Sequence, residues 1–261
     1  MHAVILAAGQ ALRLGDLCAE RPKGLLEIDG RSLLDYSLDN LVSRDVTNIT
    51  IVTGYCNGKI QRSLGRHYRG PPIEYVFNPD YESTGSVISL LIGAGHVTGS
   101  RVLVVESDLL YHPGFVDAAL SASESTVLVA DRSGSGDEVF ICANEDGYLD
   151  YLGKAATPQQ RRDSLGEYAG LALVSDQLLS AYCKAARKLK ADGLARGHYE
   201  ELLFELSCDG FAMHVHHCPS LPWTEVDTQE DFERAKAKVY PRLCHLWESR
   251  TELPKLSSPV V

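Results

Sequence analysis

The chain has 261 residues, of which 44% are apolar, and a formal net charge of −10 at pH 7. A chain of this size can bury a substantial core, and its acidic balance argues against non-specific binding to nucleic acids or anionic membranes. The seven cysteines form no CxxC pair, and no apolar run reaches the length of a membrane span. We therefore expect a cytoplasmic protein with reduced cysteines.

Short apolar runs alternate with helical patterns over the first half of the chain. The first run, residues 3–8, is apolar throughout, which is typical of a strand buried on both faces. Ser32 is expected to cap a helix whose apolar side chains recur near every 3.6 residues, and Pro113 to begin another. Further strands are expected at 49–54, 73–77, 101–108 and 125–130, with one helix ending near residue 68 and another over 86–97.

This alternation predicts an α/β fold with a Rossmann-like, doubly wound and mostly parallel sheet. In such sheets, ligands bind outside the carboxyl ends of the strands. Three turns should therefore line one crevice. They are the stretch after the first strand, the turn at Gly54 and Tyr55, and the turn at Glu106, Ser107 and Asp108.

The pattern changes after residue 131. Residues 138–152 indicate a hairpin with Asp146 and Gly147 in its turn. Strands at 167–175 and 211–217, helices at 176–191 and 198–207, and a final helix from residue 228 should follow. We expect one domain over residues 1–250, with a small β-rich part at about 132–220 and a loose tail at 251–261.

Cationic side chains follow the first strand closely. Gly9 ends that strand, and a glycine there lets backbone amides approach a phosphate. Arg13 and Lys23 could then neutralise a phosphate chain. The alternative is an ordinary turn with surface cations. Neither a Walker A loop nor a dinucleotide GxGxxG pattern is present.

Two carboxylates stand at expected strand ends. Asp108 ends a buried strand, and Asp227 follows the Trp-Thr-Glu-Val segment near the last helix. Two distant carboxylates that converge on one crevice suit Mg²⁺, which binds a few carboxylates together with phosphate oxygens and waters. The alternative is that Asp227 caps the last helix. Glu106 and Glu225 are neighbours of this pair.

The segment HVHHC, residues 214–218, invites comparison with a zinc site. On a strand, neighbouring side chains point to opposite faces, so these residues cannot easily form a tetrahedral site by themselves. We interpret them as half-exposed strand residues.

The opening segment LAAGQALRLGDLCAERPK resembles the signature of the nucleotidyltransferases that activate sugar phosphates and related compounds, roughly LAAGxGxRxxxxxxxxPK. Ala11 stands where that signature has its second glycine. The segments VVESDLLYHP, SGSGDEVF, GEYAG, HYEELL and PWTEVD follow in an order that resembles the cytidylyltransferases of phosphonate biosynthesis. Those enzymes join CMP to small phosphonates such as 2-aminoethylphosphonate or 2-hydroxyethylphosphonate.

The resemblance implies a CTP-dependent cytidylyltransferase of the nucleotide-diphospho-sugar transferase type, which uses Mg²⁺ and releases pyrophosphate. Residues 132–220 would bind the acceptor. The resemblance assigns catalysis to Arg13, Lys23 and Lys154, and the metal to Asp108 and Asp227. It assigns the nucleotide to Leu6, Ala7, Ala8, Gly9, Arg13, Lys23, Tyr55, Asn78, Thr84, Ser89, Glu106 and Ser107, and the acceptor to Lys154, Asp137, Glu138, Glu167 and Tyr168.

Several alternatives stay open at this point. The acceptor could instead be phosphocholine, an inositol phosphate or a sugar 1-phosphate, and a non-catalytic nucleotide-binding regulator could use the same scaffold. Cytosine follows from the resemblance alone, because nothing in the spacing distinguishes CTP from UTP or dTTP. A homodimer is equally open.

Overall fold

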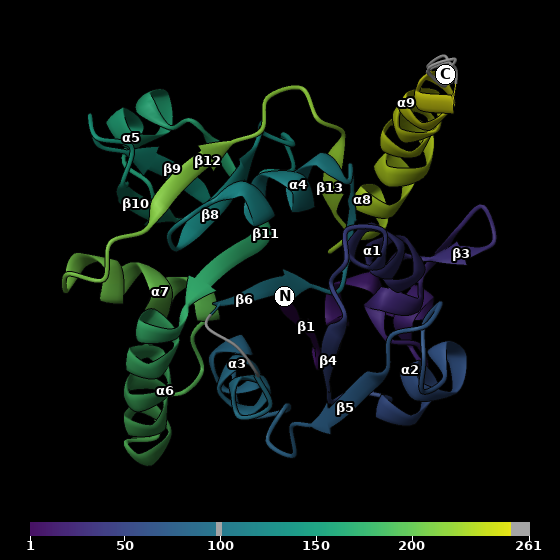
Figure 1. The fold of residues 1–261 in the computed structure, drawn as a ribbon, viewed down its shortest axis with the longest axis horizontal. Coiled ribbons are helices and arrows are strands. Elements are labelled where there is room, and N and C mark those ends of the chain that lie inside the picture. Colours follow the sequence, from purple (N-terminus) through teal and green to yellow (C-terminus); the bar gives the residue numbers. More distant parts are fainter. Residues whose placement is uncertain (98–100, 252–261) are drawn as a thin grey trace, which may run out of the picture.

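The computed structural model describes residues 1–97 and 101–251, with side chains through residue 246. The described residues contain a central sheet of nine strands, in the order β10-β9-β11-β6-β1-β4-β5 (Figure 1). Off this order, β8 pairs with β11, and β12 pairs with β8. The strands are β1 (His2–Ala7), β4 (Asn48–Thr53), β5 (Ile73–Phe77), β6 (Arg101–Glu106), β8 (Thr126–Ala130), β9 (Phe140–Ala143), β10 (Leu149–Gly153), β11 (Gly166–Ser175) and β12 (His214–His217).

Helices follow the strands in the expected alternation. They are α1 (Leu33–Val42), α2 (Asn57–Leu64), α3 (Ser86–Ala94), α4 (Gly114–Ser121), α5 (Pro158–Asp163), α6 (Asp176–Ala191), α7 (Tyr199–Cys208), α8 (Gln229–Arg234) and α9 (Tyr240–Thr251). Shorter elements are the 3₁₀ turns η1 (Leu12–Cys18) and η2 (Lys23–Leu25), the π-helical η3 (Ala235–Val239), and the strands β2 (Glu27–Ile28), β3 (Arg31–Ser32), β7 (Leu109–Tyr111) and β13 (Trp223–Glu225). None of the described helices is both long and apolar enough to cross a membrane.

The sheet is parallel in its first half and mixed in its second. β1 pairs in parallel with β4 and β6, and β4 pairs in parallel with β5, as predicted. β11 lies between β6 and β8 and runs antiparallel to both. The sequence predicted a strand at β8, but it did not predict that β11 lies between β6 and β8. Because β11 is apolar and buried over almost its whole length, it takes an interior position in the sheet.

The sheet is covered on both faces. Ala3 and Ile5 of β1 belong to a core cluster that also holds side chains of α1, α2 and α4. The alternate residues Val4 and Leu6 belong to a second cluster with α3, α6 and α7. Figure 1 shows these two groups of helices on opposite sides of the sheet. The expected doubly wound α/β architecture is thereby confirmed.

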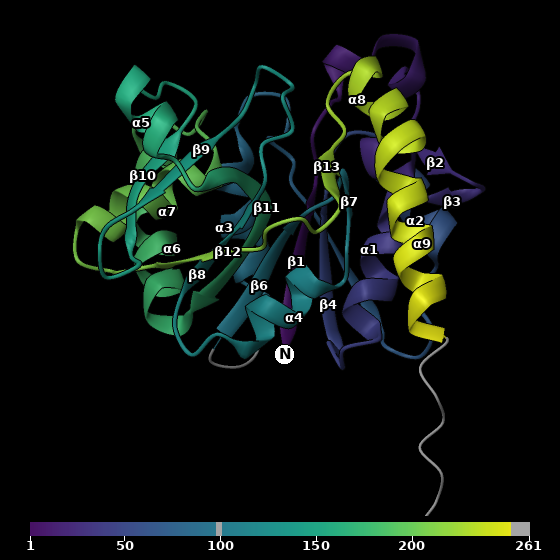
Figure 2. The same cartoon turned by 90° about the horizontal axis from the view of Figure 1, so that it is seen from above.

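The C-terminal segment returns to the middle of the molecule before its last helices begin. β13 pairs antiparallel with β7, and the Val226 N–H donates to the Asp108 carbonyl over 3.0 Å. Thr228 caps α8 through a capping box with Asp231, so capping is not the role of Asp227. Figure 2 shows α9 running along the outside of α1. The tail expected at 251–261 lies almost entirely outside the described residues.

Candidate active site

A cleft of about 510 Å³ opens at the carboxyl ends of β1 and β6, where the sheet topology predicts a ligand site. It collects side chains from both halves of the chain, including α7 and β13. Most of the predicted site residues line it. These are Leu6, Ala7, Ala8, Gly9, Arg13, Lys23, Thr84, Ser89, Glu106, Ser107, Asp108, Lys154, Glu167, Tyr168 and Asp227.

The loop after β1 is held in a left-handed turn. Ala11 has φ 58° and ψ 34°, the region that glycine favours and where the nucleotidyltransferase signature has its second glycine. The Ala11 methyl group is buried in an apolar cluster with Leu14, so the side chain contributes packing that glycine would lack. Tyr55 donates a hydrogen bond to the Ala19 carbonyl and supports this loop from outside the cleft.

Lys23 lies between the two predicted metal ligands. Its ammonium donates to Asp108 Oδ2 over 3.0 Å and also contacts Asp227 Oδ1. Arg13 binds the other oxygen of Asp227. The strand pairing of β7 with β13 brings the two aspartates together, although 118 residues separate them in the chain.

A third acidic side chain, Asp137, links Arg13 to Lys154. Asp137 Oδ2 lies 2.6 Å from Arg13 and 2.9 Å from Lys154. Cations and carboxylates therefore alternate along the cleft, and we call this arrangement the ion-pair chain. Its members are, in order, Asp108, Lys23, Asp227, Arg13, Asp137 and Lys154.

Burial and neighbouring charge shift the titration of the inner groups in opposite directions. Burial alone would lower the pKa of Lys23, but the carboxylates of Asp108 and Asp227 outweigh it and raise that pKa. Burial would raise the pKa of Asp227, but Lys23 and Arg13 outweigh it and lower that pKa. Burial raises the pKa of Asp108 despite Lys23. The ammonium of Lys23 is thus held charged by acids from two chain segments.

The carboxyl groups of Glu106, Asp108 and Glu225 each offer an oxygen, and these oxygens lie within 4.8 Å of one another. Burial, followed by mutual repulsion, raises the pKa of Glu106 and of Glu225 well above the usual range. With Asp227, four carboxyl groups face the two cations Lys23 and Arg13. This excess of hard oxygen donors fits a divalent cation such as Mg²⁺.

Two tyrosines and one further acid also line the cleft. The hydroxyl groups of Tyr168 and Tyr199 are 2.6 Å apart and buried. Glu200 is 7% exposed, and its Oε2 is the buried side-chain oxygen that has no hydrogen-bond partner among the described residues. Gly170 has φ +75°, and a Cβ there would lie 3.0 Å from Glu106 Oε2. A glycine at this position therefore leaves room for the Glu106 carboxylate.

Glu167 connects the cleft to the loop before β9. Its carboxylate accepts a hydrogen bond of 2.8 Å from the Ser133 N–H, and burial raises its pKa. Asp137 and Trp223 line an adjoining cavity of about 420 Å³ rather than the main cleft. Glu138 is half-buried near Glu167 and lines neither cavity.

Two residues predicted near the base and ribose lie away from the cleft lining. Asn78 is fully buried, and its amide donates to Ser89 Oγ over 3.2 Å, so it supports a residue that does line the cleft. Tyr55 is the residue described above that braces the loop after β1. Their roles as direct nucleotide contacts stay predictions.

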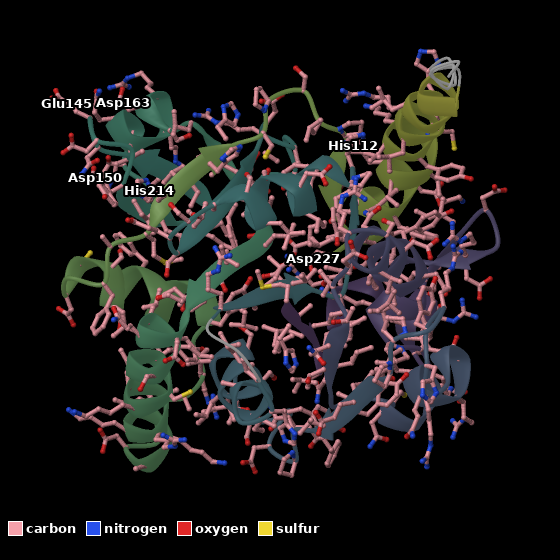
Figure 3. The ribbon with its side chains drawn as sticks, viewed as in Figure 1. His112, Glu145, Asp150, Asp163, His214 and Asp227 are labelled. Carbon is pink, nitrogen blue, oxygen red and sulfur yellow. The ribbon has the colours of Figure 1, made fainter. Side chains whose placement is uncertain are left out.

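The histidine-rich segment is not part of this site. His214 lies 3.0 Å from Glu124, and His217 lies 3.1 Å from Asp131, so the two histidines contact different carboxyl groups. Figure 3 shows His214 near Asp150 at one end of the molecule, far from the more central Asp227. The interpretation as ordinary strand residues therefore agrees with their placement.

Sequence reasoning missed Tyr81, Tyr199 and Glu200, all of which line the cleft. A signal existed for Glu200. This residue lies in the segment HYEELL, three residues before Leu203 on the buried face of α7. An acid on a buried helix face is a candidate functional residue.

Comparisons with known proteins agree with this geometry. The chain is 28% identical over 251 residues to the CMP-5'-(3-aminopropyl)phosphonate synthase of Streptomyces rubellomurinus, which covers 92% of this chain and 39% of that protein. It is 28% identical over 196 residues to the CTP:phosphoglutamine cytidylyltransferase of Campylobacter jejuni, covering 69% of this chain and 75% of that one. The chain thus spans well under half the length of the first relative.

Among solved structures, the inositol-1-phosphate CTP transferase from T. maritima superposes with a TM-score of 0.76 at 21% identity, covering 95% of this chain and 96% of the other. This likeness supports the expected nucleotide-diphospho-sugar transferase fold. The model of the MobA-like NTP transferase domain matches residues 3–194, which include the loop after β1, Lys23 and Asp108. The resemblance found in the opening segment is therefore confirmed, and the chain belongs to the family of MobA-like NTP transferases.

Proposed function

We propose that this protein is a CTP-dependent cytidylyltransferase that joins CMP to a small phosphonate and releases pyrophosphate. One observation carries the proposal. A single cleft holds Lys23 and Arg13 beside the acids at one point and Lys154 at another, so that a triphosphate and a phosphonate can lie in one cavity. The cytidylyltransferases and the aminopropylphosphonate synthase among its relatives support CTP and a phosphonate as the substrates.

In the proposed reaction, an oxygen of the phosphonate attacks the α-phosphorus of CTP in line. The new P–O bond forms as the bond to the β-phosphate breaks, and pyrophosphate leaves with the electron pair. The attacking oxygen is already anionic at neutral pH, so no general base is needed. Lys154 orients the phosphonate, while Lys23 and Arg13 neutralise charge on the triphosphate.

Asp108 and Asp227, with Glu106 and Glu225 beside them, would hold Mg²⁺. When bound, the ion would neutralise phosphate charge and help to orient the nucleotide. The contact of Lys23 with both aspartates indicates what these residues do before substrate binds. They keep a cation at the place where negative charge converges, and they hold Lys23 in a fixed position.

Trp223 does not line the main cleft, so it would not help there to surround a quaternary ammonium such as that of phosphocholine. Recognition of a quaternary ammonium calls for aromatic faces around it. The Trp223 ring borders the adjoining cavity, and its indole N–H donates to the Ala169 carbonyl over 2.8 Å. Within the described part of the chain, the aromatic rings lining the main cleft belong to tyrosines and one histidine.

Pyrophosphate release in the presence of Mg²⁺ tests the proposal. Each of the four NTPs would be combined with 2-aminoethylphosphonate, 2-hydroxyethylphosphonate, phosphocholine, inositol 1-phosphate and glucose 1-phosphate. Release with CTP and a phosphonate is the expected result. Release only with a phosphate ester would overturn the phosphonate assignment and keep the family reaction. Binding of CTP without release for any acceptor would favour a nucleotide-binding regulator.

A further inference from the structure

The cleft has an acidic end, and two of the glutamates there, Glu106 and Glu225, also lie beside the aspartates that would hold Mg²⁺. Glu106, Glu200 and Glu225 line this end together with Tyr168 and Tyr199. Among the described residues, the ion pairs of the cleft's lysines and arginine use Asp108, Asp137 and Asp227, and none of them reaches these three glutamates.

Glu200 provides an independent observation, because one of its buried carboxyl oxygens lacks a hydrogen-bond donor among the described residues. It is 7% exposed, it lines the cleft, and its Oε2 has no hydrogen-bond partner. Its other oxygen lies 4.0 Å from His198 Nδ1. A buried carboxylate oxygen without a donor is costly unless a ligand supplies that donor.

We infer that this acidic end binds the primary ammonium group of the acceptor, with Glu200 as the specificity-determining residue. This inference rests on the proposed function and deepens it: the acceptor is a short zwitterion, with its phosphonate on Lys154 and its ammonium group on Glu200. Lys154 and Glu200 both line this cleft.

The groups at this end favour a primary amine over a quaternary one. A primary ammonium has three N–H donors and needs oxygen acceptors, which the carboxylates and the paired hydroxyls of Tyr168 and Tyr199 provide. A trimethylammonium has no donor and would leave Glu200 Oε2 unpaired. The Tyr168 and Tyr199 rings meet edge to face, with centroids 6.3 Å apart.

The test compares acceptors that differ only at the far end. Wild-type protein would be assayed for pyrophosphate release from CTP with 2-aminoethylphosphonate, with 2-hydroxyethylphosphonate and with n-propylphosphonate, in which a methyl group replaces the ammonium. The Glu200→Gln variant keeps the shape and removes the charge. Glu205→Gln, on the exposed side of the same helix, is the matched control.

We expect the wild type to prefer the amine by at least about tenfold in kcat/KM, and Glu200→Gln to lose about that factor for the amine alone, mostly through KM. The KM for CTP should not change, and Glu205→Gln should match the wild type. Equal use of amine and propyl acceptors, or an equal loss by Glu200→Gln for every acceptor, would overturn the inference and leave the proposed function standing.

Calorimetric binding of the phosphonates separates the two proposals further. Without turnover for any phosphonate, the proposed function fails. Binding of 2-aminoethylphosphonate that is weakened by Glu200→Gln, with propylphosphonate bound poorly by both, would then still support the ammonium site. Binding of both phosphonates with equal affinity would overturn it.

Discussion

Replacing Lys23 by methionine removes the ammonium from between Asp108 and Asp227 and keeps the length of the side chain. Breaking a buried ion pair costs about 3–5 kcal/mol, because it leaves buried charge without a partner. The Lys23 side chain is 18% exposed and those of the aspartates 12–13%, so solvent screens part of this cost. We expect Lys23→Met to lower the free energy of unfolding at neutral pH by about 2–4 kcal/mol.

The sign of the pH dependence follows from the direction of the pKa shifts. In the wild type, the lowered pKa of Asp227 contributes stability above the usual carboxyl range, and this contribution is lost as the pH falls. In Lys23→Met, the aspartates lose their cation, so their pKa values should rise. Protonation then relieves their repulsion, and the stability difference between the two proteins should shrink as the pH falls from about 7 to about 5.

Mg²⁺ should stabilise the variant more than the wild type, because the divalent ion no longer competes with the ammonium for the same oxygens. Ion at about ten times its dissociation constant adds about 1.4 kcal/mol. Urea unfolding of both proteins with and without Mg²⁺ measures this stabilisation. In a separate assay, the rate of pyrophosphate release by Lys23→Met should be lower than that of the wild type by a factor of about 10²–10³. Lys184→Met, on the exposed side of α6, is the control. Unchanged stability together with wild-type turnover in Lys23→Met would refute the reasoning.

Three further substitutions test other parts of the site. Lys154→Ala should raise the KM for the phosphonate at least about tenfold and leave the KM for CTP within about twofold, as steady-state kinetics would show. Gly170→Ala should lower the free energy of unfolding by about 2–4 kcal/mol in urea, because it combines a left-handed φ with a close contact to Glu106; a loss below about 0.5 kcal/mol would contradict this. Thr228→Ala should cost about 1 kcal/mol through loss of the cap shared with Asp231, and an unchanged urea midpoint would show that the cap is unimportant.

Much of the candidate site could be predicted from the positions of the strand ends in the sequence. The carboxyl ends of β1 and β6 meet at one edge of the sheet, so Gly9 and Asp108 could be placed together from periodicity alone. The sequence also predicted that Asp227 joins them, but it did not predict which contact brings Asp227 there. Its position depends on the pairing of β13 with β7, and three-residue strands carry too little periodicity to be paired from sequence.

The sequence also could not predict which polar side chains are buried and which line the cleft. Asn78 and Glu200 are both polar, yet one is a fully buried support and the other lines the cleft. Whether such a residue is buried or lines the cleft depends on the tertiary packing around it, and a single sequence does not contain that information. The left-handed turn at Ala11 shows the same limit for the backbone, because alanine gives no local signal for a positive φ.

The ion-pair chain fixes three cations in one cleft of a protein whose net charge is −10. Cations alone would be mobile and would repel one another, whereas Asp137 and Asp227 hold Arg13 and Lys23 in place. A triphosphate can replace Asp137 as the partner of Arg13, because both side chains are about half exposed and such a pair is weak. The buried contacts of Lys23 with Asp108 and Asp227 are harder to break. We therefore expect the outer pairs to exchange partners when substrate binds, while the inner acids keep the charge of the site balanced.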